Sequence, residues 1–187
     1  MQSRKKQIIE TAAILFKEKG FSAVTMRDLA AAMGIKAASL YNHISSKQEI
    51  LKAIIIAIAE DFTAGMKNIM RSNDNAIGKL EQVIRLHVSI TSSNIYGMAS
   101  LNNDWMHLEE DLEYYLKLRT EYEDDFRMIL EEGIEHNEII DSNVEVMLFS
   151  ILSTLRSLYL WIPKKENLDK SVLANQLSDV LLKGINK

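Results

Sequence analysis

The residues with the clearest chemical potential lie in one short segment, residues 25–44, which reads TMRDLAAAMGIKAASLYNHI. Gly34 stands where the chain would reverse between two short helices, a position that favours a small residue. Leu29, Ala30, Ile35 and Leu40 are spaced to pack these helices together. The side chains left to face outward are Ala37, Ala38, Ser39, Asn42 and His43. A short helix with such a surface fits the major groove of DNA, where its side chains meet base edges.

The charge distribution supports a nucleic-acid partner. The chain has 187 residues and a net charge of −4, which by itself argues against DNA. Residues 1–52, however, hold nine Lys and Arg against four Asp and Glu, a net +5, so the remainder carries −9. A basic cluster of this kind neutralises phosphates and gives DNA affinity that falls with rising salt.

Composition limits the fold class and the compartment. With seven glycines and one proline the chain is poor in turn residues, which disfavours an all-β fold and favours long helices. The lack of cysteine excludes a disulfide scaffold and a thiolate zinc site. The longest apolar run, Ala53–Ala59, is too short to span a membrane, and no signal-peptide pattern is present. We therefore expect an all-α cytoplasmic protein without a membrane partner, metal or cofactor.

The helix signals divide the chain into a head of residues 1–48 and a larger part of residues 49–187. In the head, a helix through Ile8 and Phe16 should end at Gly20, and Thr25 to Asp28 reads as a capping box for a helix that ends at Met33. A third helix should cover residues 37–43. Ser46 to Glu49 reads as another capping box, which opens a longer helix.

The larger part contains the longer helices, about nine in total with those of the head. One capping box is expected at Ser142 to Glu145, where it opens a helix. Pro163 should end that helix. The expected helices are residues 76–92, a short one through Leu101, Trp105 and Leu108, residues 112–136, residues 144–161, and residues 169–183 ending at Gly184.

The head resembles the tetracycline-repressor (TetR) family of bacterial transcription regulators over about residues 5–60. The residues that carry the resemblance run from Ile8 to Phe16, then Gly20-Phe21, Thr25 to Ala30, Gly34-Ile35, Leu40 to Ile44, and Ser46 to Leu51. Lys36 departs from the Ser or Thr that many members carry as a helix cap, and Lys cannot cap in that way. Ile44 replaces the commoner Phe and keeps an apolar residue.

The resemblance implies which head residues touch DNA. Tyr41, His43 and Lys47 would contact phosphates, and Lys36, Ala37, Ser39 and Asn42 would read bases, with Lys toward guanine and Asn toward adenine as sensible pairs. Thr25 and Arg27 complete the candidate set. The alternative for Tyr41 is packing against the first helix, and for Thr25 a helix cap alone is the favoured interpretation.

The C-terminal helices are candidates for a two-fold dimer, which specific DNA binding usually requires. The helix over residues 144–161 is apolar nearly all round, so more than one side must be covered. The last helix also has a wide apolar face. We predict a homodimer through these two helices; the alternative is a core helix in a monomer.

In the resembled family a small effector enters the C-terminal half and changes the spacing of the two heads. The candidate ligand residues are His87, Trp105, Met106, Tyr122, Phe126, Arg156 and Tyr159. His87 is more simply a satisfied core histidine. Arg156 interrupts an apolar helix, where a charge is costly unless paired, so it is either an anion anchor or the partner of an interface or intrahelical group.

The C-terminal half is also loosely similar to a TetR subgroup that answers to acyl coenzyme A thioesters. The similarity rests on Glu131-Glu132-Gly133-Ile134, Tyr159-Leu160-Trp161 and Leu181 to Ile185. The predicted function is a homodimeric repressor that binds a palindromic double-stranded DNA operator and is released by an acyl-CoA or another apolar anion. A regulator of efflux or stress genes that responds to apolar drugs is the alternative.

An enzyme and a helical adaptor protein are the rival classes. The sequence has no glycine-rich phosphate loop, nucleophile elbow or HExxH motif, and its four histidines are scattered. His107 precedes three acidic residues, but neighbours on a helix point apart, so this is better interpreted as a solvated helix end. The +5 head argues against an adaptor without DNA binding. We therefore predict that the chain is not an enzyme.

Overall fold

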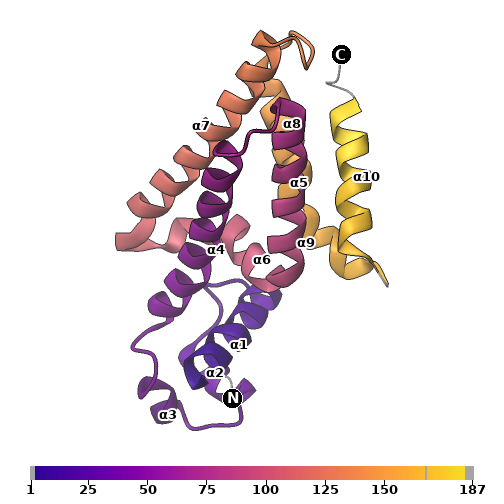
Figure 1. Cartoon of the computed structure of the whole chain (residues 1–187). Coiled ribbons are helices and arrows are strands. Elements are labelled where there is room, and N and C mark those ends of the chain that lie inside the picture. The colour runs from indigo at the N-terminus through magenta and orange to yellow at the C-terminus, as the bar shows by residue number, and fades with distance from the viewer. Residues whose placement is uncertain (1–2, 167, 184–187) are drawn as a thin grey trace. The chain divides into compact units, whose positions relative to one another are not determined.

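The computed structural model describes residues 3–166 and 168–183, and the regular elements among them are helices (Figure 1). The chain divides into two compact units: residues 1–59 with 94–116, and residues 60–93 with 117–187. Each of the nine predicted helices has a counterpart in the described residues, and the predicted eighth is divided into α8 and the one-turn α9. The bounds are α1 Arg4–Lys19, α2 Met26–Ala32, α3 Ala37–Tyr41, α4 Lys47–Met70, α5 Ala76–Ser93, α6 Ile95–Asn103, α7 Leu112–Glu135, α8 Val144–Arg156, α9 Leu158–Trp161 and α10 Lys170–Lys183.

The first unit is built on α1, which packs against α2 and α6. Ser3 caps its start by accepting from the Lys6 N–H, and Gly20, at φ +80°, ends it as predicted. The first part of α4 contributes a buried isoleucine-rich face. Gly97 lets α6 come close to that face, because a Cβ there would lie 2.6 Å from Cδ1 of Ile58.

The segment between α6 and α7 differs from the predicted single short helix. α6 ends at Asn103, and two 3₁₀ turns follow, Trp105–His107 and Glu109–Asp111. The reason is backbone geometry: Glu109 has a φ of +49°, which an α-helix does not tolerate. Leu108, between the two turns, is buried.

The second unit is centred on α5, which contacts α8, α9 and α10. Its first turn is fixed from outside the helix, since the Ala76 N–H donates to the Glu138 carboxylate at 2.7 Å. The buried Lys79 pairs with Glu132 of α7 at 3.0 Å. Such long-range partners hold the start of α5 against the end of α7.

The capping box predicted at Ser142 to Glu145 is wrong by one residue. Asn143 is the N-cap of α8, and its side chain accepts from the Val146 N–H at 3.1 Å. Glu145 instead forms an ion pair with Arg127 of α7. An Asn side chain satisfies the free amides of a helix start as well as Ser does, so the glutamate is available for the pair.

The predicted helix over residues 144–161 is interrupted at Ser157, which separates α8 from α9. Pro163 lies in a 3₁₀ turn, Ile162–Lys164, and ends the stretch as predicted. Asp169 opens α10 by accepting from the Ser171 and Val172 amides at 2.7 and 3.0 Å. The predicted stop at Gly184 lies outside the described residues.

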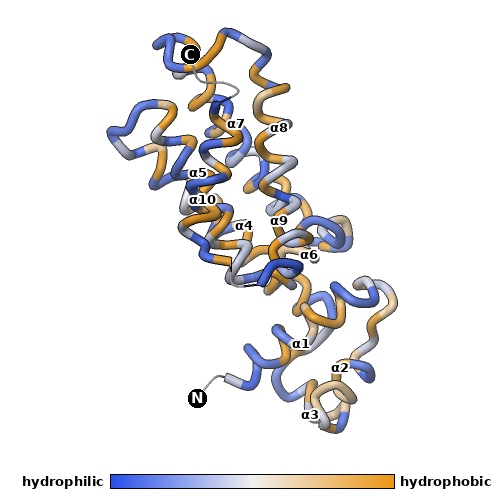
Figure 2. The backbone as a smooth tube through the Cα atoms, turned by 90° about the vertical axis from the view of Figure 1, so that its right-hand side faces the viewer, coloured by the Kyte–Doolittle hydropathy of each residue, from blue (hydrophilic) through white to orange (hydrophobic). Residues whose placement is uncertain are grey.

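Helices α8 to α10 keep an exposed apolar surface, and Figure 2 shows hydrophobic residues along α8. By length and composition the stretch Val144–Lys164 would suffice to cross a membrane, but 44% of its apolar window is buried inside the structure and core helices of soluble proteins pass the same test. We define the exposed apolar face as Val146, Phe149, Leu160, Trp161, Val172 and Val180.

Candidate nucleic-acid interface

Helix α2 is capped as the sequence predicts. The Thr25 hydroxyl oxygen accepts from the Asp28 N–H at 3.1 Å, and the Asp28 carboxylate accepts from the Thr25 N–H and hydroxyl at 2.8 and 2.6 Å. The hydrogen bonds from Thr25 lower the pKa of Asp28 below its usual range. The capping role of Thr25 is therefore confirmed, and its exposed side chain also stands at the surface of the head.

The turn between α2 and α3 is closed by two backbone hydrogen bonds. The N–H of Gly34 donates to Ala31 at 3.1 Å, and the N–H of Ile35 donates to Ala30 at 3.0 Å. With Gly34 at φ +65°, this is a Schellman motif, in which glycine takes the left-handed position without strain. The chain reversal expected at Gly34 is confirmed.

Helix α3 is shorter than predicted, because residues 42 and 43 leave the helix in a turn. Leu40 is fully buried beneath it, as expected. Lys36 is the N-cap residue and makes no side-chain capping bond, in agreement with the sequence. Five predicted DNA contacts of this helix and its flanks are exposed, namely Lys36, Ser39, Tyr41, Asn42 and His43, while Ala37 is half-buried.

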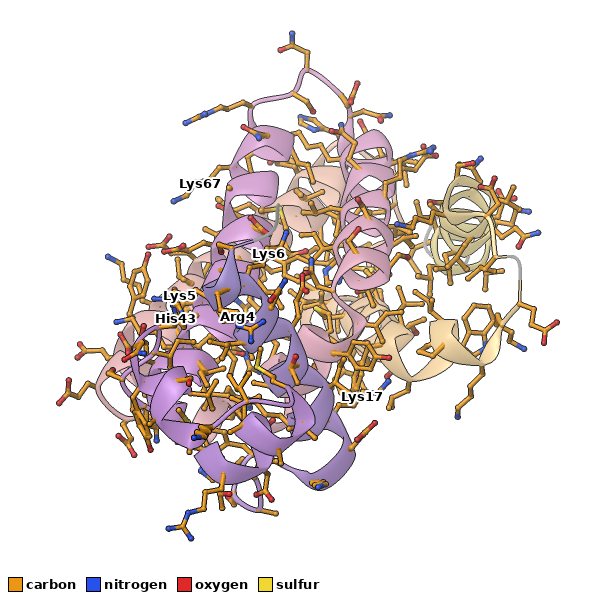
Figure 3. All side chains as sticks on the ribbon, turned by 90° about the horizontal axis from the view of Figure 1, so that it is seen from below. Arg4, Lys5, Lys6, Lys17, His43 and Lys67 are labelled. Carbon is orange, nitrogen blue, oxygen red and sulfur yellow. The ribbon has the colours of Figure 1, made fainter. Side chains whose placement is uncertain are left out.

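Tyr41 is 55% exposed, so its ring lies largely on the surface of the first unit. Arg27 of α2 is exposed as well. Figure 3 shows three further basic side chains, Arg4, Lys5 and Lys6, on the first turn of α1. The structure thus presents polar and basic groups together on this unit, as the charge of residues 1–52 predicts.

Lys47 is held differently from the other candidates. Its Nζ donates to the backbone oxygens of Phe21 and Val24, both at 2.8 Å, and lies 4.2 Å from the centroid of the Phe21 ring. The side chain is half-buried. In this structure the ammonium group therefore faces the protein.

The start of α4 corrects the second predicted capping box. Ser46 Oγ accepts from the Glu49 N–H at 3.1 Å as expected, but the Glu49 carboxylate does not return to Ser46. Its Oε2 accepts from the N–H and hydroxyl of Ser45, both at 2.7 Å, and its Oε1 pairs with Lys5 at 2.6 Å. Glu49 thereby joins the first turn of α1 to the loop between α3 and α4.

These hydrogen bonds stabilise the charged form of Glu49. The bond from Lys5 contributes most, followed by the two from Ser45, and together they lower the pKa of Glu49 from 4.5 to about 2. The carboxylate is therefore ionised at every pH at which the protein would be studied. Sequence reasoning missed this role, because the partner Lys5 is 44 residues away.

In the second unit, His87 and Tyr122 form a buried polar pair. His87 Nε2 and the Tyr122 hydroxyl are 2.8 Å apart, and the Phe62 ring packs 4.6 Å from the His87 ring. Burial, aided by the charge of Arg156, lowers the pKa of His87 to about 3, and burial raises the pKa of Tyr122 above its usual range. Both groups are neutral at pH 7.

Two polar atoms on the inner face of α5 have no hydrogen-bond partner in the structure. They are Nδ1 of His87 and Oγ1 of Thr91, which lie one helical turn apart. Thr91 is completely buried, and His87 is 3% exposed. Unpaired buried polar atoms are rare in native proteins, so these two atoms distinguish this face of α5. Thr91 was not among the candidate ligand residues predicted from the sequence, although it lies four residues after His87.

Arg156 has a partner that the sequence did not reveal. Its guanidinium donates to Glu123 of α7 at 2.6 Å, and Arg119 donates to the same carboxylate at 3.1 Å. Burial raises the pKa of Glu123, but the hydrogen bonds from Arg156 and Arg119 outweigh it and leave the pKa below its usual value. The partner lies on another helix, so the intrahelical alternative is wrong.

The seven candidate ligand residues are divided between the two units. His87, Tyr122, Phe126, Arg156 and Tyr159 belong to the second unit, where Phe126 and Tyr159 are buried. Trp105 and Met106 belong to the first unit. There the Trp105 ring stacks on Tyr115 at 5.9 Å, and Met106 is 58% exposed.

The fold and this surface define a class: a DNA-binding transcription regulator with an N-terminal helix-turn-helix and a helical C-terminal domain. Two family models match the sequence, "Bacterial regulatory proteins, tetR family" over residues 8–54 and "Tetracyclin repressor-like, C-terminal domain" over residues 73–185. The chain belongs to the TetR family of transcription regulators. Members of this family are not enzymes, in agreement with the prediction.

Similar proteins extend over nearly the whole chain. The HTH-type transcriptional repressor KstR2 of Rhodococcus jostii is 25% identical over 185 residues, which cover 97% of this chain and 91% of that protein. The solved structure of the ketosteroid transcriptional regulator KstR2 of Mycobacterium tuberculosis has a TM-score of 0.92 at 23% identity. The match covers 100% of this chain and 97% of that chain. The solved structure of the TetR-family regulator PfmR of Thermus thermophilus has a TM-score of 0.82 at 27% identity. The match covers 97% of this chain and 100% of that chain.

The geometry of Glu49 generates a prediction about pH. A carboxylate with a lowered pKa stabilises the folded protein fully above its unfolded pKa, near 4.5, and this contribution is lost as the pH falls toward about 2. Glu49→Gln should therefore lower the midpoint of thermal unfolding at pH 7, by about 2–4 °C for each kcal/mol lost. The difference from the wild type should shrink steadily below pH 4.5.

Thermal unfolding followed by circular dichroism between pH 7 and pH 3 measures both effects. Glu18→Gln, which removes an exposed carboxylate from α1, is the control for the general loss of a negative charge. A deficit in Glu49→Gln that stays constant from pH 6 to pH 3 would contradict the assigned hydrogen bonds.

Proposed function

We propose that the protein is a homodimeric transcriptional repressor that binds a palindromic DNA operator in the cytoplasm and is released by a small effector. The observation that carries the proposal is the exposed polar surface of α3 and its flanks, held in a unit whose first 52 residues have a net charge of +5. The family membership supports DNA binding, and the name of the KstR2 relatives supports repression. Residues 1–48 are proposed as the DNA-binding domain and residues 49–187 as the effector and dimer domain.

The exposed residues divide by chemistry into two groups. Lys36, Ser39 and Asn42, with the Ala37 methyl group, are proposed to read base edges in the major groove. Tyr41, His43, Arg27 and Thr25 are proposed to contact the sugar-phosphate backbone, which positions a protein without reading sequence. Lys47 belongs to neither group, because its Nζ is already bonded to two carbonyl oxygens.

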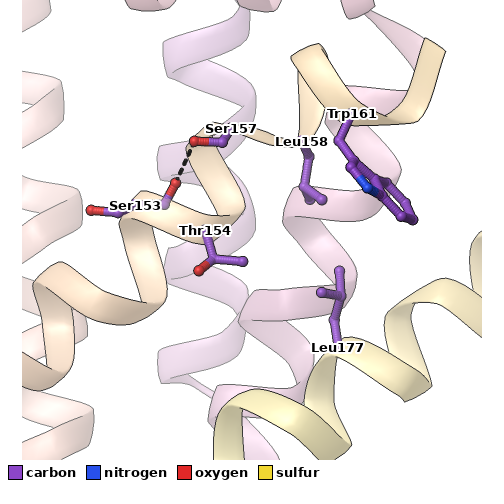
Figure 4. A pocket seen from close by; sticks show the side chains of 6 residues that line it. All are labelled: Ser153, Thr154, Ser157, Leu158, Trp161 and Leu177. Atoms are coloured by element: carbon purple, nitrogen blue, oxygen red, sulfur yellow. Dashed lines mark hydrogen bonds between the residues drawn. The ribbon is translucent and has the colours of Figure 1, made fainter. Parts of the chain in front are cut away.

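The exposed apolar face is proposed as the dimer interface. Phe149 of α8 is 70% exposed and Val180 of α10 is 74% exposed. Beside them lies a groove of about 510 Å³, lined by Ser153, Thr154, Ser157, Leu158, Trp161 and Leu177 (Figure 4). Apolar side chains around a groove are what a self-complementary two-fold contact needs.

The effector is proposed to be an apolar anion such as an acyl-CoA thioester, bound in the second unit. The buried rings of Phe62, Tyr122 and Phe126 offer an apolar environment, and Arg156 offers a positive charge beside them. The unpartnered atoms of His87 and Thr91 offer hydrogen bonds to a polar group. Because the M. tuberculosis relative is titled a ketosteroid regulator, steroid-derived anions belong in the first set of test compounds.

Selection of duplexes from random-sequence DNA tests the function directly. The wild-type protein should select a palindrome whose half-sites are about one helical turn, or a multiple of it, apart. Asn42→Ala should relax the preference at one base pair by about 1–3 kcal/mol, whereas Tyr41→Ala should weaken binding to all duplexes about equally. Met128→Ala, at an exposed position of α7, is the control. The proposed function fails if no sequence is enriched, and the assignment of α3 fails if Tyr41→Ala and Asn42→Ala both bind as the wild type does.

The dimer interface is tested by placing charges on it. Phe149→Glu and Val180→Glu should each shift the protein from dimer to monomer in sedimentation velocity, because a carboxylate buried without a partner is strongly unfavourable. Met128→Glu, at another exposed apolar position that is not part of the face, should remain dimeric. Dimers in all three variants would place the interface elsewhere.

Release of the selected duplex tests the effector class. Octanoyl-CoA or palmitoyl-CoA should release the wild-type protein in a gel shift, whereas free coenzyme A should not, because it lacks the apolar chain. Arg156→Gln should need roughly tenfold more acyl-CoA, the effect of one lost charge-assisted hydrogen bond. Arg85→Gln, which removes the charge of an exposed arginine of α5 outside this cluster, is the matched control. Release by uncharged apolar drugs alone, unchanged in Arg156→Gln, would favour the drug-responsive alternative.

A further inference from the structure

Phe21, in the loop between α1 and α2, is contacted from several elements of the first unit. Its ring packs edge-on against Phe16 of α1 at 5.1 Å and stacks on His107 at 5.3 Å. Its N–H donates to the buried Asp104 carboxylate, and its carbonyl accepts from Lys47. Phe21 is only 5% exposed. Phe21 is therefore a buried residue that α1, the segment after α6 and the start of α4 all contact.

Lys47 joins the start of α4 to Phe21 by a hydrogen bond and a cation–π contact. An ammonium group has three N–H donors, and Lys47 Nζ uses two of them on the carbonyls of Phe21 and Val24. The same Nζ lies over the Phe21 ring at 4.2 Å, where the negative face of the ring attracts a cation. The charge of Lys47 is thus satisfied from inside the protein.

The two carbonyls lie next to the helix-turn-helix. Val24 immediately precedes Thr25, the N-cap of α2, and Lys47 is the first residue of α4. Helix α3 lies between these elements in the chain, has only five residues and begins without a side-chain cap. Because a helix of this length does not hold itself in place, its position depends on the ends of α2 and α4, which Lys47 joins.

We propose that Lys47 is a positioning residue for α3 and not a phosphate ligand, an inference that rests on the proposed DNA-binding function of α3. To reach a phosphate, Nζ would have to leave two 2.8 Å hydrogen bonds and the Phe21 ring. The Val24 carbonyl would then lose the Lys47 donor, and the Phe21 carbonyl would keep only the Val24 N–H, which is unfavourable. Lys36, by contrast, is exposed at the start of α3.

Salt dependence separates the two roles. Each cation that neutralises a phosphate adds about 0.9 to the slope of log K against log salt concentration. Lys47→Met keeps the length of the side chain and removes the ammonium group. With a duplex selected by the wild-type protein, we expect Lys47→Met to lose about tenfold in affinity at an unchanged slope. Arg27→Met, which removes an exposed cation proposed to contact the sugar-phosphate backbone, should reduce the slope by about 0.9.

Hydrogen exchange of the free protein provides the second measurement. In Lys47→Met the amides of residues 22–25 should exchange faster, including the Val24 N–H that donates to Phe21, whereas Arg27→Met should match the wild type there. Circular dichroism at 10 °C gives the folded fraction to which each affinity is referred. Lys47→Arg, which keeps the charge and the donors, should recover part of the lost affinity.

Each other outcome overturns the proposal. A slope that falls by about 0.9 in Lys47→Met, with unchanged exchange of residues 22–25, would make Lys47 a phosphate ligand. Faster exchange with unchanged affinity per folded protein would make it a stabilising contact only. If the wild-type protein selects no duplex, the proposed DNA-binding function is wrong. The exchange measurement then still tests whether the Lys47 hydrogen bonds hold residues 22–25 in place.

Discussion

A five-residue helix must be held by its neighbours, and the first unit is organised around that constraint. Nucleating a helical turn is unfavourable, and isolated helices of fewer than about 12 residues are marginal in water. Helix α3, from Ala37 to Tyr41, is anchored by one buried side chain, Leu40. The rest of its fixation comes from outside: the Schellman turn at Gly34 before it and the Glu49 hydrogen bonds to Ser45 after it.

This arrangement leaves the outer surface of α3 free for recognition. The hydrogen bonds that fix α3 are made by the backbone of its flanking loops, and its buried contact is made by Leu40. Ser39, Tyr41 and Asn42 therefore remain exposed. Two basic residues of the unit, Lys5 and Lys52, are paired with acids at 2.6 Å. The net charge of +5 is therefore partly used within the protein, while Lys36 and Arg27 keep their side chains at the surface.

Local signals in the sequence predicted the elements well. The capping box at Thr25, the stop at Gly20 and the turn at Gly34 each depend on residues within one helical turn, and all three are confirmed. Long-range pairing was not predictable in the same way. Glu49 and Glu145 fit a capping-box pattern, yet their carboxylates bind Lys5 and Arg127 on other helices. The capping-box pattern identifies side chains that can bond the N-cap amide. Whether such a carboxylate instead pairs with a basic residue of another helix depends on the tertiary structure.

The polar cluster of the second unit limits what an effector must do. His87 is neutral because burial lowers its pKa to about 3, so the polarity of this face of α5 does not change near pH 7. The one charge beside it, on Arg156, is bonded to Glu123 at 2.6 Å. An anionic effector would have to share or displace that carboxylate, and breaking a partly buried ion pair is costly unless another anion replaces it. Arg119 also donates to Glu123, at 3.1 Å, so the carboxylate would keep one cationic partner if Arg156 turned to a ligand. A neutral apolar compound would leave the Arg156–Glu123 ion pair in place, so the proposed anionic effector and a neutral one differ in whether that pair is broken.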